Sequence, residues 1–192
     1  MNYNTAKYKA SYGTPAQLPE PTNMEIAFSG RSNVGKSSLL NKLFARKALV
    51  KVSSKPGKTS TINFFDVENL YFVDLPGYGY AKASASELRR WSELINAYFD
   101  QKRNLVLVVA LVDIRHAASK LDEQMIQMLK ELELDFVVIA TKADKLSNMQ
   151  RQKQIASLKK QLDLKGDLSI IACSSETGLG IDDLKRRIQL AI

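Results

Sequence analysis

The eight residues from position 30 read Gly30-Arg31-Ser32-Asn33-Val34-Gly35-Lys36-Ser37, and Ser38 follows them. They lie between an apolar run, Met24–Ser29, and a segment with apolar residues at helical spacing. The pattern GxxxxGK[ST] between a strand and a helix is typical of a phosphate-binding loop, in which backbone N–H groups point at phosphate oxygens beside a helix N-terminus. We therefore predict that Gly30 to Ser38 bind a nucleotide. Lys36 would neutralise β- and γ-phosphate charge, and the Ser37 hydroxyl would bind Mg²⁺.

Short apolar runs alternate with segments of helical periodicity along the rest of the chain, which is typical of an α/β fold with a largely parallel sheet. Strands are predicted at Met24–Ser29, Thr61–Val67, Leu70–Leu75, Leu105–Val112, Asp135–Thr141 and Leu168–Cys173. Only Glu68 and Asn69 separate the second strand from the third, so these two should form an antiparallel hairpin. The sequence thus predicts a six-stranded, mostly parallel sheet with one antiparallel hairpin strand.

Helices are predicted where apolar residues recur every three or four positions. Three such stripes are Leu39, Leu40, Leu43 and Phe44; Leu88, Trp91, Ile95 and Phe99; and Leu121, Met125, Met128 and Leu132. Two more helices are expected at about 147–162 and 180–190. Trp91 and the methionines are interpreted as core residues. Residues 1–22, which contain three prolines, are interpreted as an extended lead-in, and residues 23–192 as a single domain.

The composition excludes several classes of protein. With 192 residues, 45% hydrophobic and 25% charged, the chain has the make-up of a globular domain rather than a disordered one. The longest apolar run, Leu105–Val112, is far shorter than the roughly 20 residues of a membrane-spanning helix. The single cysteine, Cys173, cannot form an internal disulfide. We expect a cytoplasmic monomer with neither membrane nor DNA as a partner.

Positive charge is concentrated in the N-terminal third of the chain. The net charge is +8, and residues 1–60 hold ten Lys and Arg against two acidic residues, Glu20 and Glu25. Residues 31–58 contain no acidic residue at all. Such a block attracts a polyanion such as RNA, or an anionic ligand. A solvated surface explains the charge equally well, and the sequence alone leaves both interpretations open.

Two further motifs end predicted strands and fit a guanine nucleotide. At Asp74-Leu75-Pro76-Gly77, the carboxylate would hold Mg²⁺ through water and the Gly77 N–H would reach the γ-phosphate. At Thr141-Lys142-Ala143-Asp144, the carboxylate accepts two hydrogen bonds from guanine, a donor pair that adenine lacks. The Lys142 stem would pack along the base. GTP is therefore expected rather than ATP, which argues against a nucleotide kinase or an ATPase.

A fourth segment, Cys173-Ser174-Ser175, follows the last predicted strand. Its backbone N–H groups would meet guanine O6, although a serine cap for the last helix explains the residues equally well. Cys173 itself is interpreted as a small buried residue rather than a catalytic thiol.

The motifs GRSNVGKSSLLN, KPGKT, DLPGYGYA, DIRH and TKADK resemble those of the EngB (YihA/YsxC) family of bacterial GTP-binding proteins, which are relatives of Era. The similarity extends from about Pro21 to Ile192. It implies a three-layer Ras-like P-loop GTPase fold with Mg²⁺-dependent GTP binding and hydrolysis to GDP. It further implies association with the large ribosomal subunit late in its assembly, and a requirement for normal cell division. An RNA-binding factor with a vestigial nucleotide site, or another P-loop enzyme, is the alternative.

The resemblance also assigns residues that the sequence alone does not. Gly57, Lys58 and Thr59 match the first switch, so that Thr59, rather than Thr61, becomes the second Mg²⁺ ligand beside Ser37 and Asp74. Residues alone do not distinguish the two threonines. The groups expected to act on the phosphates are Lys36, Thr59, Gly77 and Asn33.

Hydrolysis is expected to be slow without a partner. Tyr78 stands where Ras-type enzymes have a water-orienting glutamine, and a phenol cannot supply a carboxamide's paired donor and acceptor. Asn33 matches a position that, in related GTPases, helps to coordinate K⁺; a loop-stabilising amide is the alternative. His116, the only histidine, is interpreted as a structural or partner-contact residue rather than a general base.

Overall fold

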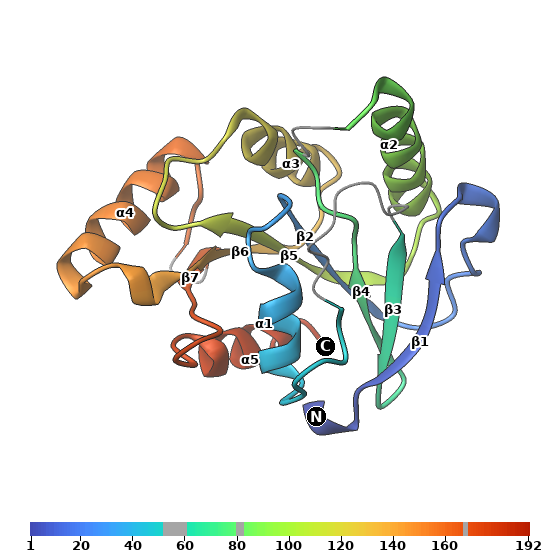
Figure 1. Ribbon diagram of the computed structural model, residues 1–192, viewed down its shortest axis with the longest axis horizontal. Helices are drawn as coiled ribbons and strands as arrows, with labels where there is room; N and C mark the ends of the chain where they lie inside the picture. The colour runs from blue at the N-terminus through green and yellow to red at the C-terminus, as the bar shows by residue number, and fades with distance from the viewer. Residues whose placement is uncertain (52–60, 80–82, 167–168) are drawn as a thin grey trace.

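The computed structural model of the chain describes residues 1–51, 61–79, 83–166 and 169–192. Every predicted strand is present in one sheet (Figure 1). The strands are β2 (Glu25–Gly30), β3 (Ile62–Val67), β4 (Leu70–Asp74), β5 (Leu105–Asp113), β6 (Phe136–Thr141) and β7 (Ile170–Ala172). β2 pairs in parallel with β4 and β5, and parallel pairing continues through β6 to β7. The predicted hairpin is confirmed: β3 and β4 are antiparallel, and both turn residues, Glu68 and Asn69, have the positive φ that a two-residue turn requires.

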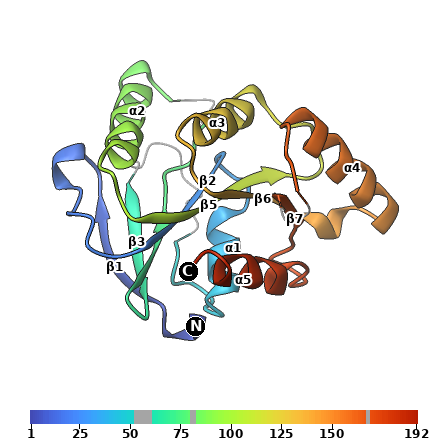
Figure 2. The same cartoon turned by 180° about the vertical axis from the view of Figure 1, so that it is seen from behind.

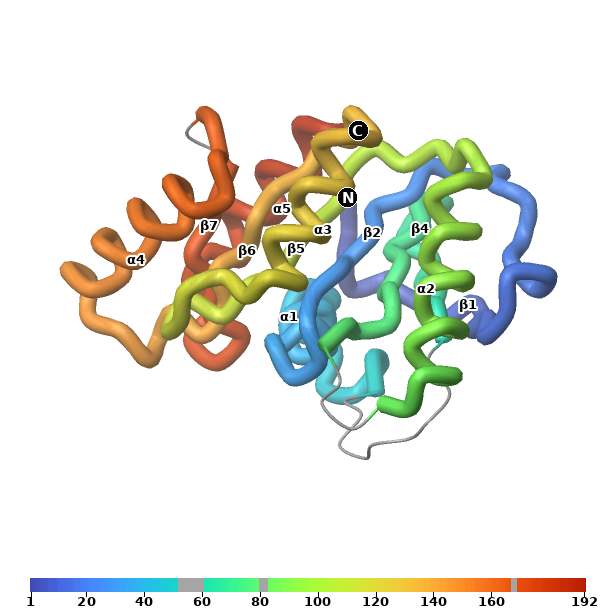
Figure 3. Tube along the Cα trace, turned by 90° about the horizontal axis from the view of Figure 1, so that it is seen from above, coloured from blue at the N-terminus to red at the C-terminus, as the bar shows by residue number. Residues whose placement is uncertain are grey.

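Over the residues that the structure describes, the sheet has seven strands, one more than the six predicted. The additional strand, β1 (Lys7–Tyr12), pairs antiparallel with β3 and gives the order β1-β3-β4-β2-β5-β6-β7. It lies between two short 3-10 helices, η1 (Tyr3–Thr5) and η2 (Pro15–Gln17). Ala6 and Leu18 are buried, so residues on both sides of β1 pack into the core. β1 and the distant helix α4 (Asn148–Gln161) lie at opposite ends of the molecule (Figure 3).

Helices cover both faces of the sheet and complete three layers (Figures 1 and 2). α1 (Lys36–Leu43) and α5 (Ile181–Gln189) pack on one face. α2 (Ala85–Asp100), α3 (Lys120–Glu131) and α4 pack on the other. A further 3-10 turn, η3 (Ala143–Lys145), follows β6. No helix in the described ranges is long and apolar enough to cross a membrane.

The predicted helix faces are only partly correct. The buried residues of α2 are Leu94, Ile95 and Tyr98, and those of α3 are Asp122, Met125, Ile126 and Leu129. Leu88 is 51% exposed, and Leu121 and Leu132 are 42% and 46% exposed. These three leucines lie at the ends of their helices, where fewer neighbours cover a side chain.

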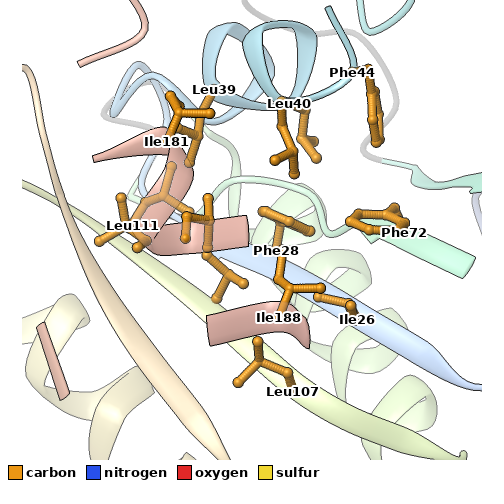
Figure 4. Close-up of a cluster of buried hydrophobic side chains, with 14 of the residues drawn as sticks. Ile26, Phe28, Leu39, Leu40, Phe44, Phe72, Leu107, Leu111, Ile181 and Ile188 are labelled. Atoms are coloured by element: carbon orange, nitrogen blue, oxygen red, sulfur yellow. The ribbon is translucent and has the colours of Figure 1, made fainter. Parts of the chain in front are cut away.

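The core beneath α1 fixes the position of the phosphate-binding motif. Leu39, Leu40 and Phe44 point from α1 toward the sheet, where they meet aromatic and aliphatic side chains of β2, β4 and β5 (Figure 4). Phe28 and Phe72 are fully buried and stack with ring centroids 5.9 Å apart. Each such side chain contributes about 1.5–3 kcal/mol when buried. This packing holds the N-terminus of α1 at the end of β2, where residues 31–35 form the intervening loop.

Candidate functional site

Four strand ends bring the predicted phosphate, metal and guanine motifs to one edge of the sheet. Ligands of open α/β sheets bind at the carboxyl ends of parallel strands. The residues that follow β2, β4, β6 and β7 there are those of the predicted phosphate, metal and guanine motifs, and Asp113 ends β5 between them. Gly57, Lys58 and Thr59 lie outside the described residues, so the predicted first switch remains a prediction.

The loop after β2 has the backbone of an anion-binding turn. Gly35 forms the N-cap of α1 with φ +104°, a left-handed conformation that favours glycine. Asn33 has φ +64° as well. The first N–H groups of a helix have no partner within it, so the start of α1 presents donors and positive potential to a phosphate.

The loop containing Gly77 approaches the phosphate-binding loop closely. A Cβ atom at Gly77 would lie 3.1 Å from the Ser32 backbone nitrogen, a tight contact that glycine avoids. The next residue, Tyr78, forms an isolated parallel bridge with Arg31, and the Ser32 N–H donates to the Tyr78 carbonyl at 2.8 Å. The two predicted phosphate motifs are therefore joined through their backbones.

Lys36 and Asp74, predicted for phosphate and metal, form an ion pair. Their side chains are 10% and 7% exposed, and the Asn63 amide donates to the second Asp74 oxygen at 3.3 Å. The Asp74 carboxylate is thus paired with one positive charge, and a divalent ion would take the place of the ammonium at this oxygen. Over the described residues, no group of three or more His, Cys, Asp or Glu is placed to hold a metal. Mg²⁺ commonly uses one or two carboxylates together with substrate phosphates, and Asp74 with the Ser37 hydroxyl fits that arrangement.

The third motif is fastened to the phosphate-binding loop. The Thr141 hydroxyl, which stands where related proteins often have asparagine, donates to the Val34 carbonyl at 2.7 Å, and it lies 3.0 Å from the Val112 carbonyl. The Lys142 ammonium donates to the Asn33 carbonyl at 3.0 Å. Because these bonds cross between β6 and the loop after β2, the predicted base-binding and phosphate-binding residues form one unit.

Asp144 is held as a carboxylate beside the end of β7. The Ser174 hydroxyl donates to it at 2.6 Å, and Lys145 lies 2.9 Å from its other oxygen. These contacts, the Ser174 bond foremost, lower the pKa of Asp144. An ionised carboxylate can accept two hydrogen bonds from a guanine edge.

The segment after β7 offers fewer backbone donors than the sequence suggests. The Cys173 and Ser174 N–H groups bond to the carbonyls of Ala140 and Leu179. Of the three predicted residues there, Ser175 is thus the one whose N–H remains a candidate for guanine O6. Cys173 is fully buried, and burial raises the pKa of its thiol to about 12, which agrees with a structural residue.

Three side-chain contacts of the site escaped sequence reasoning. The Asp113 carboxylate pairs with Lys142 at 3.0 Å and with Arg115 at 2.7 Å. Asp113 comes close to Lys142 because β5 and β6 pair in parallel with Asp113 opposite Thr141, a register that the sequence does not give. The Tyr78 hydroxyl is bonded to Asp122 of α3. Burial, then the Asp122 charge and hydrogen bond, raise the pKa of Tyr78.

His116 lines a cavity of about 510 Å³ on the flank of the phosphate-binding loop. Residues 31–34, Asp113, Arg115 and Lys142 line the same cavity. The His116 carbonyl accepts from the Gln154 amide at 2.8 Å. This backbone contact ties the segment after β5 to α4, and the role of the His116 side chain stays a prediction.

Comparison with known proteins agrees with this geometry. The family model described as 50S ribosome-binding GTPase matches residues 25–142. The protein named "Probable GTP-binding protein EngB" of Exiguobacterium sibiricum is 50% identical over 180 residues, which cover 91% of this chain and 93% of the relative. Its namesake in Kosmotoga olearia is 51% identical over 171 residues, covering 88% and 90%.

Solved structures share the architecture. The crystal structure of a probable GTP-binding protein engB has a TM-score of 0.72 and 28% identity, and the match covers 88% of this chain and 98% of that one. Aquifex aeolicus Era bound to GDP·AlF4⁻ has a TM-score of 0.66 at 23% identity, with 88% and 56% covered, and supports the fold alone. The expected α/β P-loop GTPase fold is confirmed. The identities and their coverage show that this chain belongs to the EngB family of GTP-binding proteins.

Proposed function

We propose that this protein binds Mg²⁺–GTP at the carboxyl edge of its sheet, hydrolyses it to GDP, and uses the nucleotide state to control its association with the large ribosomal subunit. Its place would be the bacterial cytoplasm, late in subunit assembly, a step on which normal cell division depends. The observation that carries the proposal is the single bonded unit that joins the Lys36–Asp74 pair to Lys142 through the phosphate-binding loop.

Each motif has a distinct part in this proposal. Gly30 to Ser38 hold the phosphates. Thr141 to Asp144 and the Ser175 N–H contact the guanine, and the Ser174 hydroxyl orients Asp144. Ser37, Thr59 and Asp74 hold Mg²⁺, which neutralises phosphate charge when bound. Gly57 and Lys58 belong to the same switch as Thr59. Leu75 and Pro76 shape the turn that brings the Gly77 N–H toward the γ-phosphate, and the Trp91 indole donates to the Pro76 carbonyl at 2.9 Å.

Catalysis in this proposal uses backbone and cation groups rather than a side-chain base. The Tyr78 hydroxyl is engaged with Asp122 at 2.9 Å, which supports slow intrinsic hydrolysis. Lys36, Thr59 and the Gly77 N–H stabilise the charge of the phosphates, and Asn33 helps to place a K⁺ ion beside them. A ribosomal partner supplies further acceleration.

The ribosomal part of the proposal draws on charge and on relatives. The family model is described as 50S ribosome-binding. Era, which shares the fold, has been crystallised with MgGDPNP and nucleotides 1506–1542 of 16S ribosomal RNA. In this chain Lys47 and Lys51 are exposed within the positive block that precedes the predicted switch. Ribosomal RNA offers phosphates that such lysines bind in a salt-dependent way.

Calorimetry with GDP and ADP in the presence of Mg²⁺ tests the nucleotide proposal. GDP should bind at least about a hundredfold more tightly than ADP, because adenine lacks the donor pair and leaves the two acceptor oxygens of Asp144 without partners. Equal affinities would overturn the guanine assignment. If the protein binds GTP but releases no phosphate in the presence of Mg²⁺, it is a GTP-binding protein and not an enzyme.

Co-sedimentation with purified large ribosomal subunits tests the partner. Retention should be greater with a non-hydrolysable GTP analogue than with GDP, and it should fall as salt rises. The double variant Lys47→Gln/Lys51→Gln should weaken retention. Lys153→Gln/Lys160→Gln, which removes the same charge from exposed positions of α4, should not. Equal retention in both nucleotide states would contradict the switch.

A further inference from the structure

The Lys142 side chain is held in place by contacts that none of the recognised motifs explains. Its backbone has φ +61°, a left-handed conformation unusual for lysine, so surrounding contacts must maintain it. Its ammonium lies 3.0 Å from the Asn33 carbonyl oxygen and 3.0 Å from Asp113 Oδ2. The side chain is 31% exposed. A flexible four-carbon chain is thereby fixed at its end by one carbonyl and one carboxylate.

Asp113 is itself oriented by Arg115. The guanidinium makes a two-pronged contact: Nε donates to Oδ1 at 2.9 Å and a terminal nitrogen donates to Oδ2 at 2.7 Å. The Arg115 backbone N–H adds a bond to Oδ1 at 3.1 Å. Paired donation of this kind fixes the plane of a carboxylate. Burial disfavours the charged form, but the bonds from Arg115 and Lys142 outweigh it and hold the pKa of Asp113 well below its usual range.

We infer that Asp113 is a positioning residue for guanine-nucleotide binding: it holds the Lys142 ammonium against the phosphate-binding loop, so that the lysine stem lies ready for the purine. The inference rests on the proposed function of Lys142. The inference also assigns a role in nucleotide binding to the segment Asp113-Ile114-Arg115-His116, which lies far from the guanine motif in the sequence. Arg115 supports the same arrangement one step further out, by orienting Asp113.

The simpler explanation is that Asp113 only stabilises the fold, and a double-mutant cycle separates the two. GDP affinity is measured by calorimetry for the wild type, Asp113→Asn, Lys142→Ala and the double variant, with folding checked by circular dichroism. Asp113→Asn should weaken GDP binding about tenfold, as expected for loss of a charged hydrogen bond. In the Lys142→Ala background the same change should alter affinity by less than about twofold, because the group on which Asp113 acts is absent.

Asp163→Asn is the matched control. It removes the same charge from a 77% exposed side chain that pairs with Lys130 after α4, and GDP affinity should stay unchanged. If Asp113→Asn does not fold, Arg115→Gln replaces it in the cycle. That variant keeps the carboxylate but loosens it, so it should weaken GDP binding about threefold, again only when Lys142 is present.

Either of two results overturns the inference. One is wild-type GDP affinity in Asp113→Asn. The other is an equal loss in both backgrounds, which would indicate a structural role independent of Lys142. Failure of the wild type itself to bind GDP would instead refute the proposed function, so the two failures are distinguishable.

Discussion

The Tyr78 hydroxyl donates a hydrogen bond of 2.9 Å to the Asp122 carboxylate, across 44 positions of sequence. Both side chains are buried, and the other Asp122 oxygen accepts from the N–H and the hydroxyl of Ser119 at the start of α3. The Tyr78 ring also meets Trp91 edge to face, with centroids 6.2 Å apart. The residue after Gly77 is thus tied to α3 by its side chain and to the phosphate-binding loop by its backbone.

Replacement of Tyr78 by Phe should lower the stability of the fold while it leaves the rate of GTP hydrolysis nearly unchanged. Because the hydroxyl bonds to α3, GTP hydrolysis should stay within about threefold of wild type, while the free energy of unfolding falls by about 1–2 kcal/mol as buried Asp122 loses a donor. Urea unfolding and phosphate release measure the two effects. Tyr12→Phe, which removes a tyrosine hydroxyl from β1 instead, is the control for the loss of a hydroxyl group. A loss of hydrolysis above about tenfold with GTP binding intact would show that the phenol takes part in the reaction.

The strands and helices that the sequence predicted are those whose local pattern agrees with their place in the fold. β1 is the exception, because Lys7–Tyr12 carries two lysines and no aliphatic run. It forms because β3 offers backbone partners and because Tyr8 and Tyr12 pack edge to face on Phe65 and Phe64, at 6.0 Å and 5.5 Å between centroids. Cross-strand pairs of this kind stabilise a sheet but leave no periodic signal in one strand alone.

The site residues also divide into those that a local sequence pattern reveals and those that only the folded chain brings together. The phosphate and guanine motifs are contiguous in sequence, since a loop between one strand and the next helix supplies each of them. The Asp113–Lys142 and Tyr78–Asp122 contacts join segments 29 and 44 positions apart. The pairing of β5 with β6 brings the first two together, and the packing of α3 beside the loop after β4 brings the second two together. Residue type and spacing could not predict either one.

Replacement of Asp144 by Asn should change the base that the protein prefers. A carboxamide presents one donor and one acceptor where the carboxylate presents two acceptors, so one of the guanine N–H groups loses its partner. GDP affinity should fall at least about a hundredfold, and xanthosine diphosphate, which has a carbonyl in place of the guanine amino group, should bind better than GDP. Calorimetry with both nucleotides measures this. An unaltered preference for GDP would show that Asp144 does not contact the base. Asp182→Asn, at a 93% exposed position of α5, is the control.

The potassium hypothesis for Asn33 can be tested without disturbing the loop. Turnover in K⁺ should exceed that in Na⁺ at equal ionic strength, and the difference should disappear when the amide is removed. Because Asn33 has φ +64°, Asn33→Gly retains the backbone conformation better than Asn33→Ala, and the two are compared. The Lys142 bond to the Asn33 carbonyl should persist in both variants. Equal rates of the wild type in the two salts, or a K⁺ response that survives in Asn33→Gly, would refute the hypothesis.

The depressed pKa of Asp113 gives stability a defined dependence on pH. Its folded-state pKa lies below the unfolded value of about 3.9, so its contribution is present above that pH and is lost as pH falls through the folded pKa. The difference in unfolding temperature between the wild type and Asp113→Asn should therefore be widest at about pH 7 and narrow below about pH 4. Thermal unfolding followed by circular dichroism over this range measures it. A constant difference across the whole range would mean that the carboxyl titrates alike in both states.

Cys173 should be unreactive in the folded protein. Its side chain is fully buried behind α5, and burial raises the pKa of the thiol to about 12, so little thiolate exists at neutral pH. An aromatic disulfide reagent should modify it at least about a hundredfold more slowly than free cysteine at about pH 8, and at the ordinary rate once denaturant is added. Cys173→Ser, which removes the chain's one thiol, gives the background reaction of the reagent without a protein thiol. Rapid, stoichiometric modification of the folded protein would mean that the junction between β7 and α5, next to Ser174 and its bond to Asp144, opens readily under native conditions.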